Sequence, residues 1–340
     1  MKLRIATRKS ALALAQTTMA ADAIVAANSA ATHAVDSVEW CKSADVGVEP
    51  LTYELVSMTT EGDRRLDKSL ASFGGKGVFI KELEIALLEG RADIAIHSLK
   101  DMPAEVLPQF KLSAVLKRED PRDAFLSRGG AAGIRFMDLP SGARVGTGSI
   151  RRIVQLKELR SDIEYVPIRG NIQTRIGKLA ELDGVVLAAA GLKRMGLADQ
   201  VTEYFSTEQV LPASGQGILA IETLADVGAR HPELREGSSE VHDSIAQILA
   251  RANDNETFCI ASAEMAYLKA LNAGCQFPVA SFAEFVSAQT LKIRGIYWDE
   301  KSEKLLRAEC VGTIDLNAPD CVQQAKNLGI TLAQEIKKQL

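Results

Sequence analysis

The chain has few cysteines, few aromatic residues and no long apolar run among its 340 residues. Its cysteines are odd in number, widely spaced and never in a Cys-x-x-Cys pattern, which argues against a disulfide framework and a structural zinc site. No apolar stretch approaches the ~20 residues that a membrane-spanning helix needs. The formal net charge of −4 argues against a nucleic-acid binder that depends on general basicity.

The start of the chain also lacks the pattern of an export or transit signal. Met1–Ile5 leads directly into an apolar strand, and residues 10–27 carry an amphipathic helical pattern. We therefore expect a cytoplasmic protein that has neither a membrane nor a nucleic acid as a partner. The length is typical of two or three domains, each able to bury its own core.

Alternating strand and helix patterns fill the first two thirds of the chain. In residues 1–116 they follow the order βαβαβ, which is typical of a parallel sheet with right-handed crossovers. The charged stretch 117–123 is predicted to link this unit to a second α/β unit, and an apolar strand at 218–222 is placed to return to the first sheet. Two crossings between two lobes predict a hinged pair with a ligand cleft between them.

Two segments lack the regular strand and helix patterns. Residues 28–50 are predicted to be a polar loop or an insertion, and residues 225–257 a helix plus loop. After these come a helix, three strands and a final helix, which predict a small α+β domain with an antiparallel sheet. The predicted domains are residues 1–116 with 218–235, residues 122–212, and residues 258–340.

The sharpest local signal follows the short apolar run Ile94–Ile96. There the sequence changes abruptly to His97-Ser98-Leu99-Lys100-Asp101. In open α/β sheets, ligands bind beyond the carboxyl ends of the strands, so Lys100 and Asp101 side by side predict a site. The alternative is a charged turn that is merely solvated, since charged pairs are common at strand ends.

Basic and small residues recur at the other turns that should face the cleft. They are Arg8 with Ser10, the run from Thr147 to Arg152, the run from Arg169 to Arg175, and Lys193 with Arg194. A helix N-terminus is itself stabilised by acidic residues, whereas cations beside it suit an anionic ligand. The pattern predicts a ligand with several carboxylates, which arginine binds bidentately, or with phosphate. The alternative is ordinary surface arginine.

Two glycine-rich segments do not complete a nucleotide-binding motif. Gly74-Gly75-Lys76-Gly77 has Leu70 where a P-loop has its first glycine and Gly77 where it has Ser or Thr, and the Gly146-x-Gly148 turn lacks the third glycine of a dinucleotide fingerprint. Residues 69–77 are therefore predicted to be a lid over the cleft or an ordinary loop.

Cys275 differs from the other cysteines in its local sequence. Gly274 favours a turn just past a helix end, which would leave the thiol on a loop. With no partner histidine in the pattern, the thiol is a covalent anchor or an inert cysteine.

The motifs of the chain, taken in order from residue 4 to residue 278, resemble those of the porphobilinogen deaminase (hydroxymethylbilane synthase) family. The segments that carry the resemblance include Arg4-Ile5-Ala6-Thr7-Arg8, Gly74-Gly75-Lys76-Gly77, His97-Ser98-x-Lys100-Asp101, Glu119-Asp120-Pro121-Arg122-Asp123, Ser149-x-Arg151-Arg152, Arg169-Gly170-Asn171, Gly215-Gln216-Gly217 and Gly274-Cys275-Gln276. The chain departs from the family pattern at Gly148, where a second serine is usual, and at Asn272-Ala273, where Glu-Gly is usual.

The resemblance implies two hinged α/β lobes like those of periplasmic binding proteins, followed by a small α+β C-terminal domain. It implies a monomeric transferase that condenses four porphobilinogen molecules head to tail, releases ammonia at each step and yields linear hydroxymethylbilane. It also implies a dipyrromethane cofactor attached covalently through Cys275. The alternative is a non-catalytic, two-lobed anion-binding receptor, which needs no such anchor.

The resemblance also implies roles for individual residues. The implied catalytic residues are Asp101, whose carboxylate would bind pyrrole N–H groups and stabilise developing positive charge, and Lys100. The implied cofactor contacts are Cys275, Lys100, Asp101, Ser98, Thr147, Ser149, Arg151, Arg152, Gly170 and Gln216. The implied substrate contacts are Arg8, Ser10, Arg169, Arg175, Arg194 and Lys76, and no metal is implied.

Overall fold

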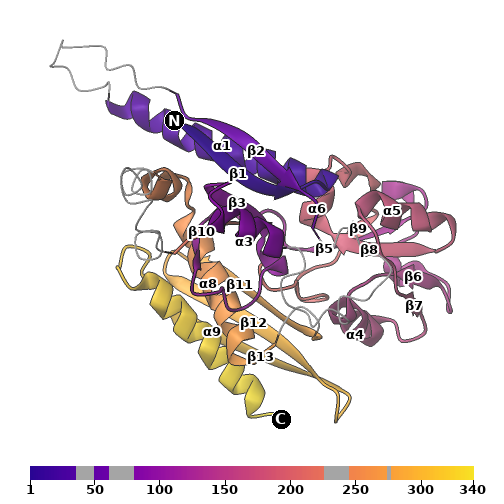
Figure 1. Ribbon diagram of the computed structural model, residues 1–340. Coiled ribbons are helices and arrows are strands. Elements are labelled where there is room, and N and C mark those ends of the chain that lie inside the picture. Colours follow the sequence, from indigo (N-terminus) through magenta and orange to yellow (C-terminus); the bar gives the residue numbers. More distant parts are fainter. Residues whose placement is uncertain (36–49, 61–79, 226–244, 274–276) are drawn as a thin grey trace, which may run out of the picture.

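The computed structural model describes residues 1–35, 50–60, 80–225, 245–273 and 277–340. These residues form two five-stranded sheets and one three-stranded sheet. Figure 1 shows the two α/β lobes side by side, with the orange and yellow third domain against both. The predicted fold class, two α/β lobes and a small α+β domain, is confirmed.

The first lobe contains a mixed sheet with the strand order β2-β1-β3-β10-β4. Its strands are β1 (Lys2–Arg8), β2 (Thr52–Met58), β3 (Ile94–Ser98), β4 (Phe110–Val115) and β10 (Leu219–Leu224). β1 runs parallel to β2 and β3, but β10 is antiparallel to both β3 and β4. β1, β2, β3 and β4 run in the same direction, which confirms the parallel arrangement predicted for residues 1–116. The returning strand β10, for which no direction was predicted, enters the sheet from the second lobe with the opposite direction.

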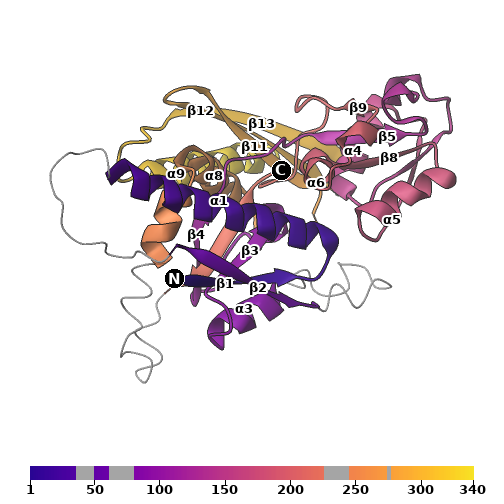
Figure 2. The same ribbon diagram turned by 90° about the horizontal axis from the view of Figure 1, so that it is seen from above.

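Helices cover both faces of this sheet. Figure 2 shows α1 (Ala11–Val35) and α3 (Lys81–Leu88) on opposite sides of it. The prediction of a loop from residue 28 is wrong for residues 28–35, which continue α1. Buried Asn28 is tolerated in this helix because its amide donates to the carbonyl oxygens of Ile24 and Ile248, at 2.8 and 3.1 Å.

A further helix over residues 245–252 also belongs to the first lobe. Its side chains Ile245, Ile248 and Leu249 are buried with Ile24 of α1 in one core. The structure of this lobe therefore extends beyond residue 235, where its boundary was predicted.

The second lobe repeats the arrangement with the strand order β7-β6-β8-β5-β9. Its strands are β5 (Asp123–Ser127), β6 (Arg144–Gly146), β7 (Glu164–Val166), β8 (Gly184–Ala188) and β9 (Glu203–Tyr204). Its α-helices are α4 (Ile150–Leu159), α5 (Ile172–Gly177) and α6 (Ala189–Arg194). Here too one strand, β5, is antiparallel to its neighbour β8, and it is the strand that leads in from the other lobe.

The third domain is an antiparallel sheet packed against two helices. The sheet has the order β11-β12-β13, and the elements are β11 (Val279–Ser287), β12 (Thr290–Asp299), β13 (Lys304–Thr313), α8 (Asn255–Ala270) and α9 (Cys321–Lys337). The two helices approach so closely that a side chain at Gly329 would collide with the backbone of Ala263. None of the helices in the described part of the chain combines the length and the apolarity that a membrane crossing needs.

The chain crosses between the lobes twice, in residues 116–122 (the first crossing) and in residues 205–218 (the second crossing). Both crossings contact a single buried carboxylate of the third domain. Glu264 of α8 is fully buried and accepts from Arg118 of the first crossing at 2.7 Å. It also accepts from the backbone N–H of Gly215 in the second crossing at 2.6 Å and from Ala283 of β11 at 2.8 Å. The third domain is thereby joined to the two segments about which the lobes could move.

Candidate active site

The turn after β3 carries the predicted catalytic pair. It is a short 3-10 helix, Leu99–Asp101, in which the Leu99 side chain is 1% exposed and packs into the core. The Leu99 N–H donates to the carbonyl of Ile218 at 3.0 Å, which fixes the turn to the start of β10. As a result Lys100 is half-buried and Asp101 is exposed at the carboxyl edge of the sheet.

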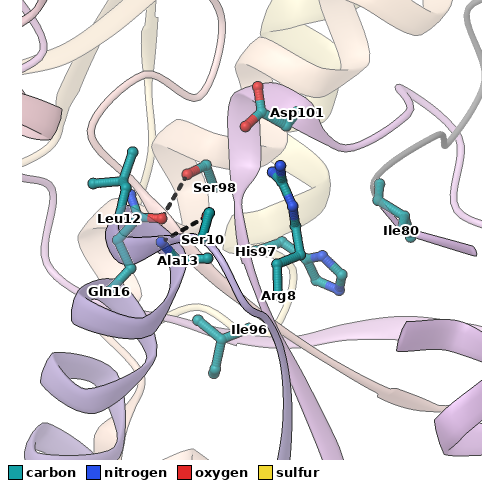
Figure 3. A pocket seen from close by; sticks show the side chains of 10 residues that line it. All are labelled: Arg8, Ser10, Leu12, Ala13, Gln16, Ile80, Ile96, His97, Ser98 and Asp101. Carbon is teal, nitrogen blue, oxygen red and sulfur yellow. Dashed lines mark hydrogen bonds between the residues drawn. The ribbon is translucent and has the colours of Figure 1, made fainter. Parts of the chain in front are cut away.

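A pocket opens at this edge between the β1–α1 turn and β3 (Figure 3). Its lining residues are Arg8, Ser10, Leu12, Ala13, Gln16, Ile80, Ile96, His97, Ser98 and Asp101. Ser98 Oγ donates to Gln16 Oε1 at 3.2 Å, and Ser10 Oγ accepts from the Ala13 N–H at 3.3 Å. Figure 3 shows the Arg8 side chain extending toward the side on which Asp101 lies.

His97, which lines the pocket, belongs to a buried acid–imidazole pair. His97 Nε2 is 3.0 Å from Glu222 Oε2, and both side chains are almost fully buried. Glu84 of α3 faces the same pair, and burial together with the negative charge of Glu222 raises the pKa of Glu84. The sequence singled out His97 within a motif, but nothing in the pattern indicated Glu222 as its partner.

Lys100 lies where the two lobes meet. Its Nζ is 3.5 Å from Gln216 Oε1, in the second crossing. Gly215 has φ +74°, and a side chain there would lie 2.7 Å from Leu99, so the crossing packs directly on the turn that carries Lys100 and Asp101. Burial lowers the pKa of Lys100 to about 8.

The second lobe brings two guanidiniums to this junction, but they are not open to solvent. Arg151 and Arg152, in the first turn of α4, are each 5% exposed. Arg151 Nη1 donates to Asp123 Oδ2 at 2.8 Å, and Arg152 Nη2 donates to Asp123 Oδ1 at 2.7 Å. The turn that carries them was expected to face the cleft, but both side chains are buried because a carboxylate of β5 pairs with them.

Thr147 and Ser149 lie in the turn that leads into the same helix. Thr147 is fully buried, and its Oγ1 accepts from the Ser149 N–H at 3.4 Å. Ser149 is the N-cap of α4, and its hydroxyl makes no capping hydrogen bond. That hydroxyl is not committed to holding the helix end.

Arg169 and Arg175 are two further basic residues of this lobe, and Gly170 lies between them in the sequence. Gly170 has φ +103°, a conformation that favours glycine, and its carbonyl accepts from Arg175 Nε at 2.8 Å. Burial lowers the pKa of Arg175, the charges of Arg152 and Arg169 act in the same direction, and Asp101 opposes them. Arg175 is therefore within electrostatic reach of Asp101, on the other lobe.

The remaining predicted site residues are not gathered at Asp101. Arg194 Nη2 donates to the carbonyl of Gly217 at 2.6 Å and lies against the second crossing. Lys76 and Cys275 fall outside the described residues, as does the whole of the predicted lid at 69–77. Of the neighbours of Cys275, Ala273 is buried and Phe277 is 52% exposed.

The arrangement suits a ligand that carries several carboxylates and a cationic or N–H-bearing centre. Arg8 and Lys100 of the first lobe and Arg175 of the second lie near one exposed carboxylate, so anionic groups of a ligand and its positive centre would find opposite charges. Among the described residues no cluster of three or more His, Cys, Asp or Glu could hold a metal ion. The Nε of Arg152 is buried and has no partner within the described chain, which fits a further acceptor from a ligand.

Comparisons with known proteins agree with this chemistry. Two family models match the chain: "Porphobilinogen deaminase, dipyromethane cofactor binding domain" over residues 3–230 and "Porphobilinogen deaminase, C-terminal domain" over residues 258–338. A protein named porphobilinogen deaminase from Clostridium kluyveri is 43% identical over 92% of this chain and 93% of its own length. The protein of the same name from Sorangium cellulosum is 40% identical, with 99% of each chain covered.

The solved structures to which the chain is similar have a much lower sequence identity to it. The VFT2 domain of BvgS from Bordetella pertussis is 12% identical, with a TM-score of 0.37 over 74% of this chain and 86% of that one. An arginine-specific periplasmic binding protein from Salmonella typhimurium is 16% identical, with a TM-score of 0.34 over 73% of this chain and 96% of that one.

Proposed function

The chain belongs to the porphobilinogen deaminase family, and from this membership we propose how its residues divide the work of the reaction. The activity is that of a transferase of tetrapyrrole biosynthesis. Four porphobilinogen molecules are joined head to tail, ammonia is released at each step, and linear hydroxymethylbilane is the product. The cofactor of the family is dipyrromethane.

Asp101 is proposed as the catalytic carboxylate. The observation that carries the proposal is its position: it is exposed at the sheet edge, with Lys100 beside it and Arg175 of the other lobe within electrostatic reach. A carboxylate there can accept hydrogen bonds from pyrrole N–H groups and stabilise positive charge that develops on the ring. It can also take up a proton from the reacting centre.

The basic residues around Asp101 are proposed to bind the acetate and propionate groups of porphobilinogen. Arg8, Ser10 and Ser98 would do so from the first lobe, and Arg169 and Arg175 from the second. The ammonium of Lys100 is held between the lobes and would bind a carboxylate next to Asp101. Arg194 and Lys76 remain proposed substrate contacts on the family resemblance alone.

The residues of the junction fit a dipyrromethane group. Its carboxylates match the buried, unpartnered Nε of Arg152 and the uncommitted hydroxyl of Ser149. We propose that Thr147, Ser149, Arg151, Arg152, Gly170 and Gln216 hold these carboxylates and that Cys275 provides the covalent attachment. When bound, the group supplies the pyrrole to which each new unit is joined.

The activity is tested by incubating the purified chain with porphobilinogen and measuring ammonia release and pyrrolic product. Release of one ammonia per porphobilinogen consumed, with linear tetrapyrrole as product, is expected. Binding of porphobilinogen without consumption would instead support the anion-binding receptor. After acid denaturation the protein itself should colour with an Ehrlich-type aldehyde, because its cofactor is pyrrolic.

The remaining properties are proposed from the family resemblance. We expect a cytoplasmic monomer that binds no nucleic acid, which light scattering and cell fractionation would test. We also propose the division into residues 1–116 with 218–235, residues 122–212, and residues 258–340, with the first unit extended to include the helix at 245–252. Limited proteolysis should cut first between these units.

A further inference from the structure

Asp123 is a buried carboxylate to which neither the sequence motifs nor the reaction assigns a task. It is the first residue of β5, where the first crossing enters the second lobe, and it is fully buried. Its two oxygens accept from Arg151 and Arg152 at 2.8 and 2.7 Å. Burial alone would raise the pKa of Asp123, but the two guanidiniums outweigh it and lower the pKa, so the carboxylate is ionised.

A third donor connects this carboxylate to the catalytic turn. Gln216 Nε2 donates to Asp123 Oδ1 at 2.9 Å and to the carbonyl of Pro121 at 2.7 Å. The oxygen of the same amide accepts from Lys100 Nζ at 3.5 Å. Because one amide serves both contacts, its orientation is fixed: the NH₂ group faces the carboxylate, which turns the oxygen toward the ammonium.

We propose that Asp123 is a positioning residue that orients Arg151 and Arg152 and, through Gln216, holds the Lys100 ammonium beside Asp101. Asp123 itself would touch neither substrate nor cofactor. It would align an anion-binding group of the second lobe with the catalytic turn of the first. The functional consequence rests on the proposed role of Lys100 in binding carboxylates.

The charges that face Lys100 come from three elements. Asp101 of the 3-10 turn and Asp123 of β5 favour its protonated form, whereas Arg151 and Arg152 of α4 oppose it. Loss of the Asp123 charge would remove one favourable interaction and leave both guanidiniums uncompensated. Lys100 should then lose its proton at a lower pH.

The experiment measures the titration of Lys100 directly in the holoenzyme. Its rate of acylation by acetic anhydride is followed against pH by mass spectrometry of the peptide that contains it. The variants are Asp123→Asn, which removes the charge, and Gln216→Leu, which removes the connecting amide. Asp93→Asn is the matched control, because it neutralises another largely buried carboxylate that is paired with an arginine, Arg4, at the opposite end of β3 from Lys100.

In the Asp123→Asn protein the midpoint of Lys100 labelling should fall by about one pH unit, the size that a neighbouring charge commonly produces. In the Gln216→Leu protein it should fall by less, and in the Asp93→Asn protein it should stay unchanged. Unchanged midpoints in both test variants would overturn the proposal. Should Asp123→Asn fail to fold, Gln216→Leu alone decides: a fall supports the proposal and an unchanged midpoint overturns it.

The same measurement separates this inference from the proposed function. If the midpoint falls but the KM for porphobilinogen and its pH dependence stay as in the wild type, the positioning is correct and Lys100 does not bind substrate. If the midpoint is unchanged while Lys100→Gln raises KM, Lys100 binds substrate without help from Asp123.

Discussion

Arg118 and Glu264 form a buried ion pair, 2.7 Å between Nη1 and Oε1, that joins the first interlobe crossing to helix α8. The carboxylate is fully buried and also accepts from the second crossing. Removal of one partner from such a pair is strongly destabilising, because the other charge stays buried without compensation. Loss of either charge should therefore destabilise the protein at the point where the lobes and the third domain meet.

Glu264→Gln should lower the free energy of unfolding by about 3–5 kcal/mol, the usual range for breaking a buried ion pair. Urea unfolding measures the effect. Glu105→Gln is a suitable control, because Glu105 pairs with Lys269 of the same helix at 2.9 Å but both side chains are exposed. Equal effects in the two variants would show that burial at Glu264 does not matter.

Asp101→Asn should reduce kcat by about 10²–10³-fold and leave KM and the unfolding midpoint close to those of the wild type. The exposed side chain makes no contact on which the fold depends, whereas an amide cannot neutralise a developing cation. Asp138→Asn provides the control, since Asp138 is also exposed and also ends a 3-10 helix. A kcat within a few-fold of the wild type for Asp101→Asn would remove Asp101 from the catalytic role.

Arg175→Gln should impair growth of the chain of pyrroles more than stability. Its guanidinium is within electrostatic reach of Asp101 on the other lobe, so partly elongated enzyme complexes should accumulate after limited exposure to porphobilinogen. Native mass spectrometry counts the units added. Arg128→Gln is matched to it, because Arg128 Nε also donates to a backbone carbonyl, that of Leu179, but on an exposed surface. The same distribution of intermediates in both variants would argue against substrate binding by Arg175.

The KM for porphobilinogen should rise as the pH passes about 8, the pKa of Lys100. Lysine is cationic below its pKa, so attraction for a substrate carboxylate is present at lower pH and is lost as the pH rises. Lys100→Gln should show a higher KM at neutral pH and no such rise near pH 8. A wild-type profile that the substitution leaves unchanged would assign the rise to another group.

Cys275→Ser should abolish most of the activity and the colour reaction with the aldehyde, because a hydroxyl is a much weaker nucleophile than a thiolate for forming the attachment. Intact-protein mass spectrometry should show the wild type heavier than its sequence by one two-pyrrole unit. Cys310→Ser is the control and should keep the added mass, since Cys310 is half-buried in β13. Active wild-type protein with an unmodified Cys275 would contradict the anchor.

Local sequence predicted the architecture and the position of the turn that carries Lys100 and Asp101. The apolar run Ile94–Ile96 followed by polar residues identified the end of a strand, and Asp101 does lie at the carboxyl edge of the sheet. These are properties of consecutive residues, so periodicity and composition are sufficient to predict them. The direction of β10 in the first sheet depends instead on a strand pairing more than a hundred residues away.

Asp123 shows why part of the site could not be predicted. In the sequence it ends the charged run that begins at Lys117, which is typical of a solvated linker. Its burial depends on Arg151, Arg152 and Gln216, which approach it only in the folded chain. The same contacts explain why two arginines expected in an open cleft are buried, since charged side chains are buried when partners satisfy them.

The place of β10 in the first sheet has a consequence for the order in which the protein can be made. β10 lies between β3 and β4, so β4 has no neighbour in that sheet until residues 219–224 have left the ribosome. All five strands of the second sheet lie between residues 123 and 204 and are synthesised earlier. The second lobe can thus be complete while the first still exposes two unpaired strand edges. A nascent chain paused before residue 219 should be the species most prone to aggregate.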